Sequence, residues 1–229
     1  MKILSRLQSR LSQALVPIVR VGGIRFYCPT PFSVWRAETL LTKEPETIAW
    51  IDRMNPGEVF YDIGANVGCY SLYAAQRGLH VVAFEPGASN VAVLMRNLEL
   101  NPSPGRFEAF PVALAGETRV GMLGMNHTEA GRALHGINRP MRFGQPTMIY
   151  ALDELIAEFR LPPPDHIKID VDGAEDSVLR GAPHALAGTT SIMMESAEHL
   201  MVPGFNWIRS AGADVIDGRQ EWNHFYERA

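Results

Sequence analysis

Cysteine is scarce in this sequence, which holds only Cys28 and Cys69 among its 229 residues. Two cysteines cannot build the disulfide framework of a small secreted protein, so we expect reduced thiols and a cytoplasmic location. Cys69 has neither metal-ligand spacing nor a neighbouring base, and we interpret it as a packed side chain. Long apolar runs are missing too, because no stretch approaches the roughly 18 residues of a membrane-spanning helix.

An excess of positive charge is also absent. The formal net charge is -4 and the pI is about 6.0, whereas domains that bind nucleic acid carry a strongly basic surface. We therefore expect no nucleic-acid partner. With 46% hydrophobic and 20% charged residues, the chain is long enough for one domain with a full core.

Residues 59–70, VFYDIGANVGCY, join an apolar run to a turn of small residues and then to an amphipathic helix. The turn contains Gly64, Ala65, Asn66 and Gly68. A buried parallel strand that leads into such a turn presents free N–H groups and the positive end of a helix dipole to a ligand. Glycine lets the main chain approach that ligand closely. The plainer interpretation is an ordinary connection between a strand and a helix.

A second apolar run ends on Glu85, about twenty residues after Gly64. An acidic residue at this offset, on the tip of the neighbouring strand, can bind the two hydroxyls of a ribose. The turn opens with Asp62 and lacks the middle glycine of a dinucleotide fingerprint. An acid there repels a pyrophosphate but suits the ammonium group of an amino acid. The pattern favours S-adenosylmethionine as cofactor and disfavours an NAD-linked reductase.

Apolar strands alternate with amphipathic helices along the rest of the chain, which predicts an α/β fold with parallel pairing and right-handed crossovers. The later strands are expected at 107–114, 166–171, 190–196, 214–216 and 222–226, the last of them antiparallel. Helices are expected at 38–54, over the cofactor site, and near 204–211.

Residues 1–37 are predicted to form an extension of the domain that occupies residues 38–229. The extension begins with a basic amphipathic helix. Its apolar stripe consists of Leu4, Leu7, Leu11 and Leu15. Two interpretations remain open: the helix docks on the domain or on a second subunit of a homo-oligomer, or it makes a peripheral contact with an anionic membrane. The narrow stripe favours docking, and a short hairpin or edge strand is expected at 19–27.

Several segments match one known pattern. They are RAETLLTKEPETIAWID (36–52), DIGANVGCYSLYAA (62–75), VVAFEP (81–86), the helix at 94–101 and KIDVDGAEDSVLRGA (168–182). Together they resemble the FkbM-type S-adenosylmethionine-dependent methyltransferases. KIDVDGAE is specific to that family, in which Glu more often stands at the position of Asp172. That exchange keeps the charge and shortens the reach of the side chain.

The resemblance implies a Rossmann-like class I methyltransferase, with a mostly parallel seven-stranded sheet and helices on both faces. It implies S-adenosyl-L-methionine as cofactor and places Val112 and Ala113 near the adenine, with Pro86 among the cofactor contacts. The implied reaction is methyl transfer to a hydroxyl of a sugar, a glycan or a secondary metabolite. The alternative is a catalytically inactive accessory protein that binds the cofactor. Such a protein would tolerate loss of Asp170.

Residues 115–148 break the strand–helix rhythm and are predicted to contain a substrate loop. Segments 120–123 and 147–150 are expected to pair as an added hairpin. The remainder would lie over the site and carries polar side chains at His127, Arg132, His135, Asn138, Arg139 and Arg142. The three arginines suggest an acceptor that bears a phosphate or carboxylate.

Asp170 is expected at the carboxyl end of a parallel strand, the edge at which open sheets bind ligands. Glu195 and His199 end the following strand, and His135 comes from the substrate loop. We predict that the general base for a hydroxyl acceptor is one of these four residues. Asp172 and Glu175 are either part of the site or caps of the following helix. Because no fourth oxygen ligand can be placed, no metal site is predicted.

Overall fold

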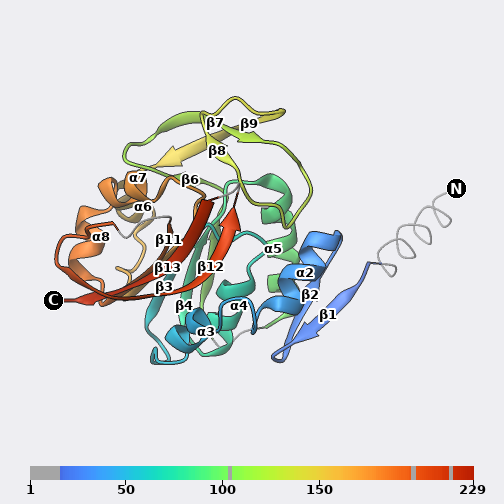
Figure 1. Ribbon diagram of the computed structural model, residues 1–229, viewed down its shortest axis with the longest axis horizontal. Helices are drawn as coiled ribbons and strands as arrows, with labels where there is room; N and C mark the ends of the chain where they lie inside the picture. The colour runs from blue at the N-terminus through green and yellow to red at the C-terminus, as the bar shows by residue number, and fades with distance from the viewer. Residues whose placement is uncertain (1–15, 103–104, 197–199, 217–218) are drawn as a thin grey trace, which may run out of the picture.

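The computed structural model describes residues 16–102, 105–196, 200–216 and 219–229. A large mixed sheet runs through the molecule, and a smaller sheet lies above one edge of it (Figure 1). The large sheet has the order β12 (Phe205–Ile216), β13 (Arg219–Arg228), β11 (Ser191–Ser196), β10 (His166–Ile169), β3 (Val59–Ile63), β4 (His80–Phe84) and β5 (Phe107–Phe110).

Strands β3, β4, β5, β10 and β11 pair in parallel, and β13 is antiparallel to both β11 and β12. The prediction of an α/β fold with a seven-stranded sheet and an antiparallel terminal strand is confirmed. The sheet is mixed, because β13 inserts between β11 and β12. The parallel strands end together at one edge of the sheet, and the candidate site lies there.

Helices cover both faces of the sheet. They are α2 (Pro31–Thr39), α3 (Pro45–Ile51), α4 (Cys69–Gln76), α5 (Ala88–Leu100), α6 (Leu152–Phe159), α7 (Glu175–Arg180) and α8 (Pro183–Gly188). Successive side chains of a strand point to opposite faces. Phe60 of β3 therefore packs with Trp50 of α3 and Leu72 of α4 in one core cluster. Its neighbour Tyr61 packs with Leu152 of α6 in the other.

The expected helix near 204–211 is wrong, because β12 occupies Phe205–Ile216. Strand β12 pairs with β13 over almost its whole length, with two register shifts. The β-branched and aromatic residues of this segment fit a pleated edge strand, and tertiary pairing overrides the helical spacing.

The expected helix at 38–54 is also wrong in its extent, since two helices, α2 and α3, stand in its place. Helix α2 begins earlier because Thr30 and Ser33 form a capping box and Pro31 occupies the first turn. Pro45 opens α3. The predicted boundary between 37 and 38 falls inside α2.

The expected strand 107–114 is divided between the two sheets. Strand β5 ends at Phe110, and β6 (Ala113–Leu114) pairs with the smaller sheet. Pro111 lies between them and has no N–H to donate to a ladder. The chain therefore leaves the large sheet at this proline and turns upward over its edge.

The hairpin of β1 (Ile18–Val21) and β2 (Ile24–Tyr27) confirms the expectation for 19–27. Asparagines of α5 hold it: Asn97 Oδ1 accepts from the Tyr27 N–H at 2.7 Å, and Asn101 Oδ1 accepts from the Arg25 N–H at 2.9 Å. The stripe of the predicted N-terminal helix, Leu4 to Leu15, lies outside the described residues.

The smaller sheet has the order β6, β9 (Phe143–Tyr150), β7 (Arg119–Met125) and β8 (Gly136–Ile137). Its β7–β9 pairing, with Val120 opposite Met148, confirms the predicted hairpin. We call this sheet and its connections the cap. Because β6 continues directly from the large sheet, the cap lies over the ends of the parallel strands (Figure 1).

Candidate functional site

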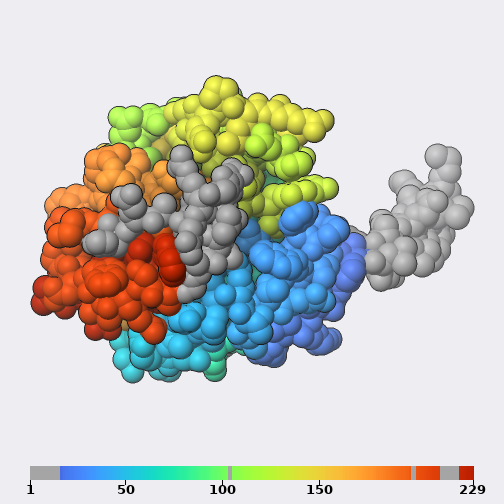
Figure 2. All heavy atoms as spheres, in the orientation of Figure 1, coloured from blue at the N-terminus to red at the C-terminus, as the bar shows by residue number. Residues whose placement is uncertain are grey.

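A cavity lies at the carboxyl ends of β3, β4 and β10, beneath the cap. The predicted site residues that line it are Gly64, Asn66, Glu85, Pro86, Val112, Ala113, His135 and Asp170. Residues from four strand ends and from the predicted substrate loop thus meet at one place. Figure 2 shows the cap atoms, green to yellow, as a layer above the blue atoms of α2.

The turn after β3 is shaped by contacts that leave no room for side chains. Gly64 has φ +87°, and a Cβ on it would lie 1.8 Å from the Asp170 carbonyl oxygen. Gly68 has φ +85°, and its Cβ would lie 2.2 Å from Leu94 of α5, outside the cavity lining. Ala65 is buried and donates its N–H to the Phe84 carbonyl at 3.0 Å. Gly64 and Asn66 are the members of this turn that face the cavity.

Glu85 lies at the tip of β4 on the cavity wall. Its Oε2 accepts from the Asn66 N–H at 2.9 Å and its Oε1 from the Gly87 N–H at 2.8 Å. Burial raises the pKa of Glu85, and these backbone N–H groups act against that rise. The two strand tips are thereby joined through one carboxylate of fixed orientation, which suits a site for a pair of hydroxyls.

Asp62 does not line the cavity, contrary to the direct ammonium contact that the sequence suggested. It is buried, accepts a hydrogen bond from Ser71 of α4, and lies 3.9 Å from Lys168 Nζ. Burial raises the pKa of Asp62, and the Lys168 charge opposes the rise. The reason is the strand period: Asp62 at the end of β3 shares a sheet face with Phe60 and points beneath α4.

Strand register aligns four ionisable side chains on that face. Lys168 pairs with Asp62 in the β10–β3 ladder, and its Nζ lies 2.8 Å from Asp170 Oδ2. Glu195 of β11 is buried and hydrogen-bonded to Asp170. Burial alone would raise the pKa of Asp170, but the Lys168 ammonium holds it well below its usual range. The negative charge of Asp170, together with burial, raises the pKa of Glu195 well above its usual range.

The two shifts run in opposite directions, which favours a negative charge on Asp170 and a proton on Glu195. A quarter of the Asp170 side chain is exposed, on the cavity side. Glu195 lies behind it and does not line the cavity. The structure thus places these two predicted candidates differently: Asp170 faces the cavity, and Glu195 packs behind Asp170.

His135 comes from the cap and lines the same cavity. Its Nε2 is buried and has no hydrogen-bond partner among the described residues. Burial and the nearby Arg36 charge lower the pKa of His135, so its ring is neutral at physiological pH. His199, the fourth predicted candidate, lies outside the described residues.

Residues 130–135, which we call the strap, carry His135 across the mouth of the cavity. Hydrogen bonds from four parts of the fold hold the strap. They join Thr30 Oγ1 to the Ala130 carbonyl at 2.6 Å, Asn90 Oδ1 to the Gly131 N–H at 2.8 Å, Asn66 Nδ2 to the Arg132 carbonyl at 2.9 Å and Asp172 Oδ2 to the Leu134 N–H at 2.7 Å. The strap is thus built into the site.

Asp172 lines the cavity, whereas Glu175 stabilises the turn that follows β10. Asp172 lines the cavity with φ +55°, a backbone conformation in which a residue other than glycine is uncommon. Burial and the charge of Asp170 raise the pKa of Asp172 to about 7. Glu175 is buried and accepts from the Gly173 N–H at 2.9 Å in the turn before α7, whereas no side chain caps the N-terminus of α7, so the capping interpretation is wrong.

The three predicted loop arginines differ in their positions and in their partners. Arg132 lines the cavity, but its guanidinium stacks on the Phe32 ring and pairs with Glu129. Arg139 lines the cavity and has no ion-pair partner among the described residues. Arg142 is exposed and is not part of the cavity lining.

Two cavity residues have no role assigned by the sequence pattern, Arg36 of α2 and Asn90 of α5. Arg36 falls within a segment of family resemblance, which was the available signal. Within the described residues, no group of three or more His, Cys, Asp or Glu side chains could hold a metal ion. The same part of the chain contains no helix that is long and apolar enough to cross a membrane.

Residues 62–219 match the family model of the methyltransferase FkbM domain. This match includes the turn after β3, the tip of β4 and the strand that carries Asp170. The chain belongs to the FkbM methyltransferase family.

The chain is also similar to individual proteins whose names state an activity. It is 25% identical over 194 residues to the hexuronic acid methyltransferase AglP of Haloferax volcanii, covering 78% of this chain and 73% of AglP. It is 30% identical over 97 residues to a tRNA (guanine(37)-N(1))-methyltransferase of Leishmania major, covering 42% of this chain and only 14% of that protein.

Among solved structures, the magnesium protoporphyrin IX methyltransferase ChlM of Synechocystis, with bound SAM, superposes with a TM-score of 0.52. The match covers 93% of this chain and 87% of ChlM, at 12% sequence identity. A putative transferase of Pyrococcus horikoshii gives a TM-score of 0.54 at 13% identity, covering 93% and 72% of the two chains. These likenesses show the shared α/β fold.

Proposed function

We propose that this protein is a Rossmann-like class I O-methyltransferase that moves a methyl group from S-adenosyl-L-methionine to a hydroxyl of a sugar, a glycan or a secondary metabolite. One observation carries the proposal: Gly64, Glu85 and Asp170, from three adjacent strand ends, face one cavity. A glycine turn at a helix N-terminus, a carboxylate for a ribose and an ionised base are the parts that this reaction requires.

The residues present fit the cofactor. Gly64 packs so closely on the Asp170 backbone that only glycine fits there, and it lines the cavity with Asn66. Gly64 and Asn66 would hold the methionine portion, Glu85 the ribose hydroxyls, and Pro86, Val112 and Ala113 the adenine. When bound, S-adenosylmethionine supplies a methyl group already activated on a sulfonium. Ala65 and Gly68 support the turn from behind.

Asp170 is the base in this proposal. It faces the cavity as a carboxylate, because Lys168 at 2.8 Å stabilises the ionised form. It takes the proton of the acceptor hydroxyl as the new O–CH₃ bond forms, and that proton later leaves to solvent. Glu195 stays protonated and donates to Asp170, which fixes the orientation of the base. Neutral His135 lines the cavity and helps to position the acceptor.

Orientation supplies most of the expected rate enhancement. Holding two reactants in line is worth roughly 7–11 kcal/mol, while a general base contributes about 10²–10⁴-fold. The cavity under the cap serves the larger of these effects, because strap residues that line it are hydrogen-bonded to or next to residues that follow the strand ends.

The similarity to AglP supports a sugar as acceptor, and a hexuronate-containing glycan is the first one to test. The net charge of -4 argues against an RNA acceptor, despite the short match to a tRNA methyltransferase. The intact Asp170–Lys168–Glu195 arrangement favours an enzyme over an accessory protein. A cytoplasmic location and a homo-oligomer remain part of the proposal.

Two measurements test the function. Calorimetry should show binding of S-adenosylmethionine and S-adenosylhomocysteine but not of NAD, and Glu85→Ala should lose most of that affinity while it unfolds as the wild type does. Mass spectrometry of glycans and small metabolites, from cells with and without the gene, should reveal a missing methyl group. Cofactor binding without any methylated product would favour the accessory protein, and binding of NAD alone would overturn the proposal.

A further inference from the structure

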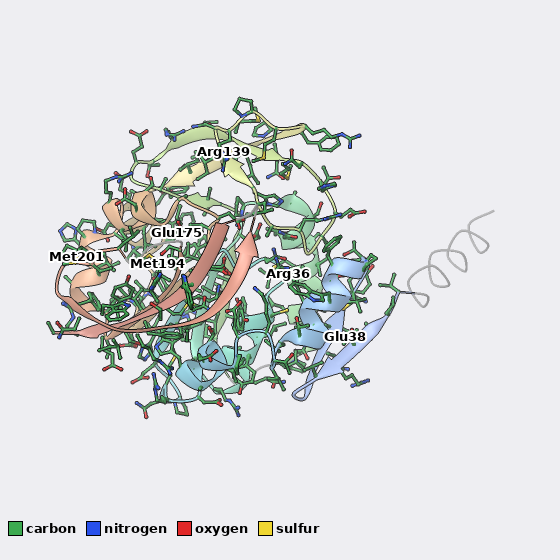
Figure 3. All side chains as sticks on the ribbon, in the orientation of Figure 1. Arg36, Glu38, Arg139, Glu175, Met194 and Met201 are labelled. Atoms are coloured by element: carbon green, nitrogen blue, oxygen red, sulfur yellow. The ribbon has the colours of Figure 1, made fainter. Side chains whose placement is uncertain are left out.

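Arg36 is a cation on the cavity wall that uses few of its hydrogen-bond donors. It is half-buried in α2, and its Nε donates to the Gly131 carbonyl at 2.6 Å. Within the described residues, no acidic side chain forms an ion pair with it, and its terminal N–H groups donate to no protein atom. Figure 3 shows Arg36 beside α2, below the cap layer that carries Arg139.

Partial burial of a guanidinium without a neighbouring anion costs desolvation free energy. It presents five N–H donors in a planar fork that matches a carboxylate. The bond from Nε to Gly131 fixes the plane of this fork at the cavity wall that Arg36 helps to line. The geometry therefore suits an anion supplied by a ligand.

The position of Arg36 indicates which anion this is. Its Nε donates to the Gly131 carbonyl, and the carbonyl of the next strap residue, Arg132, accepts from Asn66 of the turn at 2.9 Å. Two neighbouring strap residues thus join Arg36 to the turn of Gly64 and Asn66, which lines the same cavity. The methionine end of the cofactor would occupy this region, and it carries a single carboxylate.

We propose that Arg36 binds the α-carboxylate of the cofactor's methionine moiety, and this inference rests on the proposed function. The carboxylate would complete the donors of the guanidinium and sit near the N-terminus of α4, where the helix dipole also favours a negative charge. Arg36 thereby distinguishes a complete cofactor from an adenosine compound that lacks the amino-acid portion.

Calorimetry with two ligands isolates this contact. S-adenosylhomocysteine carries the carboxylate, whereas 5′-methylthioadenosine keeps the adenosine and the sulfur but has no amino-acid portion. Arg36→Gln removes the charge, and its amide can still donate to the Gly131 carbonyl. We expect its affinity for S-adenosylhomocysteine to fall about 10- to 100-fold, while its affinity for 5′-methylthioadenosine stays at the wild-type value.

Two further variants serve as controls. Arg36→Lys keeps a point charge without the fork, so it should lose less affinity for S-adenosylhomocysteine than Arg36→Gln and none for 5′-methylthioadenosine. Arg139→Gln removes the other unpaired arginine of the cavity and should leave both affinities unchanged. Thermal unfolding of each variant shows whether it is folded, and Arg36→Lys carries the test if Arg36→Gln is not.

The outcomes separate the possible roles. Equal losses for the two ligands would mean that Arg36 only anchors the strap, and unchanged affinities would mean that it does not touch the cofactor; either result overturns the inference. If the wild type binds neither ligand, the proposed function itself fails. Selective loss of S-adenosylhomocysteine supports the contact, whatever the acceptor proves to be.

Discussion

The floor and the cap of the cavity are built on different principles. The floor consists of parallel strand ends, where ladder register fixes Asp62, Lys168 and Asp170 relative to one another. The cap reaches the site through the strap, which is held by single hydrogen bonds from side chains such as Asn66 and Asn90. Residues on strand ends are held more precisely than residues on loops, so we expect the reacting groups on the floor. We expect the residues that select the acceptor on the cap.

The largest expected effect is on the floor. Asp170→Asn should reduce turnover about 10²–10⁴-fold, because the amide cannot accept the acceptor proton. Cofactor affinity should stay close to that of the wild type, as measured by calorimetry. Glu195→Gln is the matched control: its amide can donate to Asp170 as the protonated acid does, so most of the turnover should remain. Equal losses in the two variants would contradict the assigned proton positions.

Gly64→Ala tests whether the floor can accommodate an added Cβ. The new Cβ would meet the Asp170 carbonyl at 1.8 Å, on a backbone with φ +87°, so we expect a loss of about 3 kcal/mol or more in unfolding free energy. Gly173→Ala is the control, since its φ is +96° but no atom lies within 4 Å, and strain alone should cost about 1–2 kcal/mol. Denaturant unfolding measures both variants. Equal costs would show that the close contact does not matter.

The link between floor and strap is sensitive to pH. The pKa of Asp172 rises from 3.8 to about 7 on folding, so its contribution to stability is full below pH 4 and is lost as the pH rises through 7. Asp172→Asn has no such loss, and we expect it to gain on the order of 1–2 kcal/mol over the wild type between pH 4 and pH 8.5. Denaturant unfolding at both values checks this. Exposed Asp176→Asn should show no comparable pH-dependent gain.

The smallest expected effect belongs to the cap surface. Arg139→Glu should raise the Michaelis constant for an anionic acceptor about 3- to 10-fold, with the turnover number and cofactor affinity unchanged. Arg142→Glu, outside the cavity lining, should change none of these constants. Steady-state kinetics with the acceptor found by mass spectrometry makes the comparison. A neutral acceptor, or equal effects in the two variants, would argue against a role for Arg139 in recognition.

The contrast between locally determined strand ends and non-local contacts explains what the sequence could predict. Local patterns located the turn at Gly64, the tip at Glu85 and the strand end at Asp170, because each depends on a few neighbouring residues. The fate of Asp62 was not predictable from its spacing, since the register of β10 decides that Lys168 becomes its partner. A helix was expected where β12 lies because its pairing with β13 is non-local.

The strap and Arg36 were hardest to foresee. Residues about one hundred positions apart meet there, as Thr30 and Ala130 do, and no periodicity records such a contact. Asp172 stayed ambiguous for a related reason. Its bond to the Leu134 N–H comes from the cap, and only the assembled fold shows that Asp172 faces the cavity while Glu175 does not.

The burial of Lys168 has an evolutionary corollary. Its ammonium is almost fully enclosed between the carboxylates at positions 62 and 170, so a homologue that lost either acid would leave a positive charge stranded in its core. Such a homologue should also have replaced the lysine, and the three positions are expected to vary together. A homologue without an acid at position 170 is therefore expected to differ at positions 62 and 168 as well.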